Sequence, residues 1–119
     1  MRRVPVIVVV EDDWRTRHFI CTVLKYSINA EVIEVLHAGD VPRRTIDLLI
    51  SNVELDGAKS GIDVAREIAI RNPAAEVLLM SGRVRPPCDL HADWMFLSIP
   101  FPTATFLNCV NQLCGAPSR

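Results

Sequence analysis

Polar residues that could bind a cation or an anion follow three short apolar runs of the chain. The runs cover residues 6–10, 48–51 and 77–80, and the polar residues after them are Glu11, Asp12 and Asp13, then Asn52, then Ser81. Carboxylate and amide oxygens suit a hard cation such as Mg²⁺. Carboxylates that precede a helix are also favoured by the helix dipole, so one acid of the triplet is expected to cap a helix.

The apolar runs themselves predict the strands of a parallel sheet. Five stretches rich in β-branched and other apolar residues are expected to be strands, at 6–10, 31–36, 48–51, 77–80 and 95–99. Several of them are continuously apolar, which is typical of strands in a sheet that helices cover on both faces. Apolar residues at helical spacing predict three such helices, at 13–26, 61–71 and 103–113, the last with Thr103 as its N-cap.

The two remaining connections, 37–45 and 82–93, leave room only for short helices. Strands that alternate with helices indicate an open, doubly wound α/β sheet. Ligands of such sheets bind beyond the carboxyl ends of the strands. The candidate site therefore lies where the acids 11–13, Asn52, Ser81 and the pair Ile99-Pro100 follow their strands.

Size, charge and cysteine content limit the classes of function. The chain has 119 residues, of which 50% are hydrophobic, so we expect one domain over residues 1–114 and a tail at 115–119. Thirteen Lys and Arg against 14 Asp and Glu give no overall field for binding nucleic acid or an anionic membrane. No apolar run approaches the roughly 20 residues that cross a bilayer. The four cysteines form no CxxC pair, so we expect reduced thiols and a cytoplasmic protein.

The residues at the strand ends, taken in order, resemble the receiver domain of bacterial two-component response regulators, the family of the chemotaxis response regulator. The resemblance covers nearly the whole chain, and it implies a flavodoxin-like fold with strand order 2-1-3-4-5. The pocket residues that it implies are Glu11, Asp12, Asn52, Ser81, Ile99 and Pro100. It further implies that Phe96 is the aromatic switch residue and that the Ile99-Pro100 bond is a candidate for the cis form.

Two positions depart from the family's pattern. Asn52 stands where the family has the aspartate that accepts a phosphoryl group, and Ile99 stands where it has a lysine. A carboxylate can attack phosphorus and form an acyl phosphate, whereas a neutral carboxamide is a poor nucleophile. A buried lysine beside an amide would lose its hydration without gaining an anion, so Ile99 is compatible with Asn52. We therefore expect a receiver-like module of a phosphorelay that is not phosphorylated at the usual site.

The resemblance also implies how such a module acts. The expected partner is a sensor kinase, a phosphotransfer protein or a downstream signalling protein, bound on the face from Pro86 through the strand at 95–99 and the last helix. A homodimer through the strand and the helix is a second expectation for that face. We expect no enzyme activity and no required cofactor. Mg²⁺ binding by Glu11 and Asp12 is expected to be weaker than in the family, because one carboxylate is missing.

Three other functions agree with parts of the pattern. A conventional receiver could use Ser51 or Ser81 as a substitute phosphoacceptor, although neither hydroxyl has an evident base in the sequence. The acids 11–13 could hold a metal for phosphoester hydrolysis, but no Gly-rich phosphate loop accompanies them. A flavodoxin-like cofactor site is disfavoured, because three successive acids would repel the phosphate of the cofactor.

Overall fold

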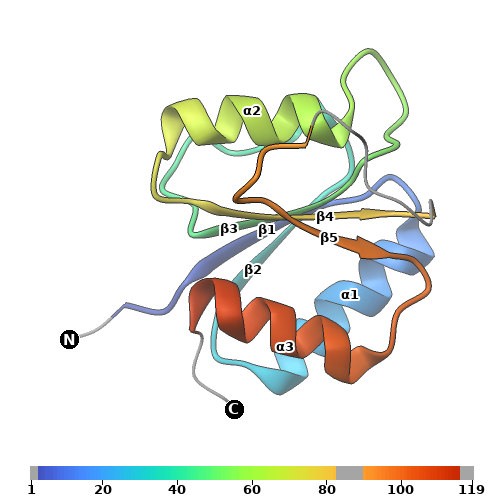
Figure 1. The fold of residues 1–119 in the computed structure, drawn as a ribbon, viewed down its shortest axis with the longest axis vertical. Helices are drawn as coiled ribbons and strands as arrows, with labels where there is room; N and C mark the ends of the chain where they lie inside the picture. Colours follow the sequence, from blue (N-terminus) through green and yellow to red (C-terminus); the bar gives the residue numbers. More distant parts are fainter. Residues whose placement is uncertain (1–2, 83–89, 116–119) are drawn as a thin grey trace.

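Five parallel strands form one sheet in the order β2-β1-β3-β4-β5 (Figure 1). The computed structural model describes residues 3–82 and 90–115. The strands are β1 (Val6–Val10), β2 (Glu31–Val35), β3 (Leu48–Asn52), β4 (Glu76–Ser81) and β5 (Met95–Ser98). The predicted sheet and strand order are therefore confirmed, with strand ends within one residue of those expected.

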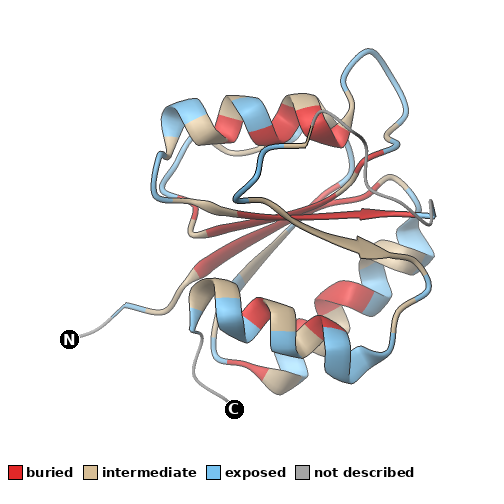
Figure 2. Cartoon of the chain, in the orientation of Figure 1, coloured by how far each residue is buried: buried red, intermediate tan, exposed pale blue. Residues whose placement is uncertain are grey.

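Three helices cover the two faces of the sheet, with α1 (Trp14–Ser27) and α3 (Thr103–Cys114) on one side and α2 (Gly61–Arg71) on the other (Figure 1). Alternate residues of β1 point to opposite faces: Ile7 and Val9 pack in the core under α1 and α3, whereas Val8 and Val10 pack in the core under α2. The middle strands are consequently buried on both faces, and much of β2 and all of β5, the two edge strands, are less buried (Figure 2). No helix within the described ranges is long and apolar enough to span a membrane.

The helix ends follow local sequence, with one difference from expectation. Asp13 caps α1 by accepting a hydrogen bond from the backbone N–H of Arg15 at 3.0 Å. Ser60 and Asp63 form a capping box at the start of α2. The prediction that Thr103 caps α3 is wrong, because the N-cap is Pro102 and Thr103 is already helical. The extended backbone of Pro102 makes the transition into the helix, and its side chain offers no cap hydrogen bond.

The two short connections contain no long helix in their described residues. Between β2 and β3 the chain forms only the 3-10 turn η1 (Ala38–Asp40), which agrees with the expectation of a short second helix. Between β4 and β5, residues 90–94 form a turn without a helix, and residues 83–89 are outside the described part of the chain. Among the described residues, α2 is therefore the one long helix that covers this face of the sheet.

A glycine at the start of α2 lets the helix approach the end of β3 closely. The backbone N–H of Gly61 donates to the carbonyl of Val53 at 2.8 Å. A Cβ atom at residue 61 would overlap with the carbonyl oxygen of Asn52 and lie 2.9 Å from Oγ of Ser51. Because the first clash is with backbone, no rotamer change relieves it. Glycine at this position therefore fixes where the tip of β3 sits.

We expect Gly61→Ala to lower the free energy of unfolding by about 2 kcal/mol, because the added methyl group forces the start of α2 away from β3. Urea denaturation followed by circular dichroism measures the change. Gly39→Ala is the control, since a Cβ atom at residue 39 meets nothing within 4 Å, and it should change the stability by less than about 0.5 kcal/mol. Equal stabilities for the two variants would contradict the close approach.

Candidate functional site

The carboxyl ends of β1, β3 and β4 bring four predicted site residues to one edge of the sheet. Glu11 and Asp12 directly follow β1, while Asn52 and Ser81 are the last residues of β3 and β4. The strand register places Asn52 beside Met80, one residue before Ser81. Residues that are 70 positions apart in the sequence thus form one polar cluster, as the rule for parallel sheets predicts.

Glu11 is the buried acid of this cluster, with only 2% of its surface exposed. Its Oε1 accepts the backbone N–H of Asp13 at 3.1 Å, and its Oε2 has no hydrogen-bond partner among the described residues. Burial raises the pKa of Glu11, and the facing amide of Asn52 acts against that rise. A buried carboxylate oxygen without a partner is costly, so a bound cation or a proton would stabilise this position.

Asp12 is the more exposed acid of the pair, and its partner is a loop that follows β3. Its Oδ2 accepts the backbone N–H of Asp56 at 2.7 Å. Burial opposes ionisation of Asp12, but hydrogen bonds, chiefly from Asp56, outweigh it and hold the pKa of Asp12 below its usual range. The pKa values of the two neighbouring acids therefore shift in opposite directions, and Glu11 keeps its proton to the higher pH.

Asn52 contributes a neutral amide at the tip of β3. Its Oδ1 accepts the backbone N–H of Glu54 at 3.0 Å, and its side chain lies close enough to Glu11 to favour the ionised form of that acid. An aspartate at this position would place a third carboxylate next to Glu11 and Asp12 and would repel both. The amide thus lets the two acids share a small site without a further negative charge.

Ser81 is fully buried, and its Oγ donates to Oε1 of Glu54 at 2.7 Å. The expectation that the Ser81 hydroxyl lacks a possible base is therefore wrong, because a carboxylate lies within hydrogen-bond distance. The sequence analysis did not identify the Glu54 side chain as a partner of Ser81. The available signal was an acid two residues beyond Asn52, in a loop that must pass the end of β4.

The remaining predicted residues have packing roles at this edge. Ser51 is buried, and its Oγ donates to the Asn52 carbonyl at 3.0 Å. Ile99 is half-buried against the core under α1 and α3, its N–H donates to the Ser81 carbonyl at 2.7 Å, and its peptide bond to Pro100 is cis. Phe96 is half-buried on the α2 face. The residue that directly follows β5 at this end of the sheet is thus apolar.

Similar proteins are found by comparison with solved structures. No protein-family model matches the sequence, and no curated protein matches it. A signal receiver domain of an HD domain-containing protein from Pseudomonas fluorescens gives a TM-score of 0.80 at 20% identity, covering 93% of this chain and 94% of that chain. A response regulator receiver protein from Sinorhizobium medicae gives 0.80 at 17% identity, covering 95% and 96%. The receiver domain of the hybrid histidine kinase CckA gives 0.77 at 25% identity, covering 92% and 98%.

The chain therefore has the fold of response regulator receiver domains over nearly its whole length. The resemblance derived from the strand ends is confirmed at the level of the fold. Sequence identities this low do not carry the chemistry of those proteins to this chain. The activity of the site must be argued from its own residues.

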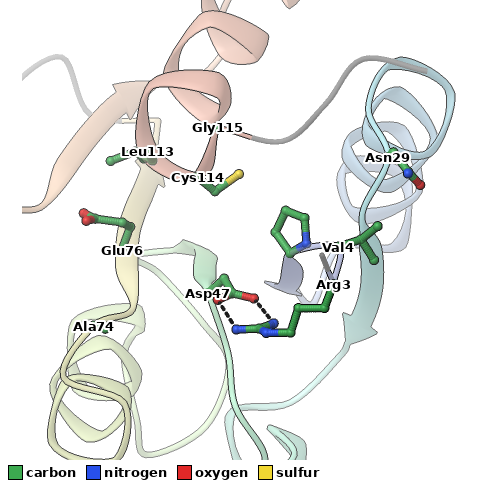
Figure 3. A pocket seen from close by; sticks show the side chains of 10 residues that line it. Arg3, Val4, Asn29, Asp47, Ala74, Glu76, Leu113, Cys114 and Gly115 are labelled. Carbon is green, nitrogen blue, oxygen red and sulfur yellow. Dashed lines mark hydrogen bonds and ion pairs between the residues drawn. The ribbon is translucent and has the colours of Figure 1, made fainter. Parts of the chain in front are cut away.

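A pocket lies at the opposite end of the sheet from the acidic cluster, where the strands begin (Figure 3). It measures about 540 Å³ and is lined by Pro5, Asp47, Glu76 and the end of α3, among others. Arg3 and Asp47 form a two-pronged ion pair on its wall, with both N–O distances 2.8 Å (Figure 3). Asp47 also accepts the backbone N–H of Val6 at 2.7 Å. These contacts connect the segment at the start of β1 to the loop before β3, so we assign Asp47 a structural role.

Asp47→Asn should therefore lower the stability at neutral pH by about 1 kcal/mol, because the charged acceptor is lost. The hydrogen bond to Arg3 is the main cause that holds the pKa of Asp47 below its usual value. This stabilisation is present above the pKa of the unfolded state, about 4, and it is lost as the pH falls through the lower pKa of the folded state. Urea midpoints should thus differ at neutral pH and converge in acid. A difference that is independent of pH would contradict this role.

Proposed function

We propose that this chain is a receiver-type signalling module that binds a protein partner and does not accept a phosphoryl group at residue 52. The observation that carries the proposal is Asn52 at the tip of β3, beside Glu11 and Asp12. An amide at this position cannot form the acyl phosphate that an aspartate forms. The fold and the position of the acids agree with a receiver, and the residues that depart from its pattern are Asn52 and Ile99.

The charges around Asn52 support the same conclusion. A phosphoryl group at residue 52 would lie near the carboxylates that surround the site, Glu11, Asp12 and Glu54. The apolar Ile99 offers no compensating charge at the end of β5. Uncompensated negative charges in a partly buried site repel strongly. Loss of the lysine and loss of the aspartate therefore belong together as one electrostatic change.

The alternative phosphoacceptors are poorly placed. Ser51 and Ser81 are fully buried, and each hydroxyl already donates a hydrogen bond within the chain. Glu54 could act as a base for Ser81, but a phosphodonor would first have to reach a hydroxyl that has no exposed surface. The hypothesis of phosphoester hydrolysis loses support as well. It requires the acids 11–13 to hold a metal, but Asp13 caps α1 and is not part of the Glu11–Asn52 cluster.

Surface composition supports protein binding. The large exposed apolar side chains of the described residues include Trp14, Phe19 and Tyr26 on α1, exposed by 62%, 49% and 80%. Trp14 directly follows the cap residue Asp13 and therefore lies near the acidic cluster. Exposed aromatic side chains are characteristic of protein interfaces. We propose that a kinase, a phosphotransfer protein or a downstream signalling protein contacts α1 next to this cluster.

The face predicted from the sequence remains a second candidate. Pro86, where that face was predicted to begin, is outside the described residues. In the part that is described, β5 is an edge strand with half-buried apolar side chains, and the largest exposed apolar residues are on other elements. A homodimer through β5 and α3 stays a prediction.

Mg²⁺ fits the acidic cluster through Glu11 and Asp12. The unpartnered Oε2 of buried Glu11 is the observation that favours a cation. Within a receiver, Mg²⁺ would neutralise negative charge beside the tip of β3. With two acids instead of three, binding should be weak, and the ion is not required for the proposed protein contact.

Treatment with Mg²⁺ and acetyl phosphate should leave the intact mass of the wild-type protein unchanged, because Asn52 is not a nucleophile. The double variant Asn52→Asp with Ile99→Lys should gain the mass of one phosphoryl group, which peptide mapping should locate at residue 52. The single variants separate the effect of the acceptor from that of the cation. A phosphoryl group on the wild-type protein would contradict the proposal, and its position would show whether Ser51 or Ser81 accepts it.

Isothermal titration calorimetry should show that the wild-type protein binds Mg²⁺ at least about tenfold more weakly than Asn52→Asp, since the variant restores one negative charge. Asp12→Asn should bind still less. Asp13→Asn is the matched control, because Asp13 is a helix cap, and it should leave the affinity unchanged. Equal affinities for the wild-type protein and Asn52→Asp would show that Asn52 does not border the cation site.

A further inference from the structure

The short connection between β2 and β3 leaves one side of α2 partly uncovered. Of the described residues, only η1 and those after it connect these two strands, whereas α1 and α3 together cover the other face of the sheet (Figure 1). Ile33 of β2 and Val41 after η1 pack against the core under α2 but stay half-buried. Ile70 of α2 is 80% exposed. Apolar surface therefore remains accessible where a full crossover helix would cover it.

A pocket of about 330 Å³ lies between this connection and α2. We call it the η1–α2 groove, and its residues are 38, 39, 41, 43, 59, 67, 70 and 71. Backbone and small side chains of the η1 segment form one wall, and Ile70 with Arg71 belongs to the other. None of these residues takes part in the cluster around Asn52, so the groove is a separate feature of the molecule.

The groove carries an excess of positive charge. Three cations, Arg43, Lys59 and Arg71, line it together with one acid, Glu67. Lys59 is neutralised by Glu67, because their side chains form an ion pair at 2.6 Å. Arg43 and Arg71 are exposed and have no ion-pair partner within residues 3–82 and 90–115. Two guanidinium groups beside apolar surface are thus available to an anionic ligand.

We propose that the η1–α2 groove binds an acidic, amphipathic helix of a partner protein. Carboxylates of that helix would pair with Arg43 and Arg71, whose planar guanidinium groups suit bidentate contacts. An apolar residue of the helix would pack on Ile70 and Val41. The bound helix would occupy the side of α2 that the short connection leaves open.

The balance of charges favours an acidic protein segment over nucleic acid or lipid. The chain has a formal net charge of −1, and the groove contains Glu67 and borders the exposed Asp40. A phosphate backbone calls for a stripe of many cations, which two free arginines do not form. A carboxylate-bearing helix needs only a few matching charges and benefits from the apolar contact.

The test uses an isotope-labelled full-length chain and a synthetic helical peptide that has glutamates on one face and leucines on the other. Amide chemical shifts recorded by NMR during titration with the peptide should change at residues 38–43 and 67–71. Matched peptides that carry glutamine or lysine in place of glutamate measure the contribution of charge. Separate titrations with a single-stranded oligonucleotide and with phosphatidylserine vesicles test whether the groove binds nucleic acid or an anionic membrane instead.

Charge reversal by Arg43→Glu with Arg71→Glu should weaken binding of the acidic peptide at least about tenfold. Ile70→Ser should also weaken it, by removing the apolar contact. Arg66→Glu is the matched control, because Arg66 lies on α2 and does not line the groove, and it should bind with nearly unchanged affinity. All of these side chains are exposed, so the variants are expected to fold normally.

Binding that maps to the groove, requires glutamate and is lost on charge reversal would establish the proposal. Absence of peptide binding, shift changes on other elements, or equal affinity of the lysine peptide would overturn it. Tighter binding of the oligonucleotide or the vesicles at the same residues would also overturn it, in favour of a nucleic acid or a membrane. The outcome is independent of whether residue 52 accepts phosphate.

Discussion

A buried carboxylate at the carboxyl edge of the sheet constrains everything around it. Glu11 is almost completely enclosed, and one of its oxygens has no partner among the described residues. A second buried anion beside it would need a cation nearby, whereas a neutral amide does not. The neutral Asn52 next to Glu11, and the apolar Ile99 after β5, are both compatible with this electrostatic constraint.

The loop after β3 completes this site from within the chain. Its Glu54 accepts the Ser81 hydroxyl, and its Asp56 N–H donates to Asp12, so the loop is held at both β1 and β4. Gly61 then allows α2 to begin in direct contact with the tip of β3. The loop groups Glu54 and Asp56 are thus hydrogen-bonded within the chain, whereas Oε2 of Glu11 has no partner among the described residues.

The same fold also offers surfaces that its short connections create. On the face with α1 and α3, two helices pack over the sheet and leave aromatic side chains of α1 exposed at the outer surface. On the other face, η1 is too short to flank α2, so Ile70 remains beside a groove with Arg43 and Arg71, which have no ion-pair partner among the described residues. This groove shares no residue with the cluster around Asn52.

The sequence by itself determined the strands, the three long helices and the residues that meet at the strand ends. The hydrophobic periods of strands and helices depend only on neighbouring residues, and the carboxyl ends of parallel strands lie together at one end of the sheet. The sequence also placed a neutral amide, Asn52, at the end of the third strand, with no aspartate adjacent to it. Only the tertiary structure decided which acid of the triplet caps a helix, that Pro102 and not Thr103 is the N-cap of α3, and that Glu54 reaches Ser81. These outcomes depend on the paths of loops across neighbouring strands, and loop paths are set by packing between segments distant in the chain, which no local period encodes.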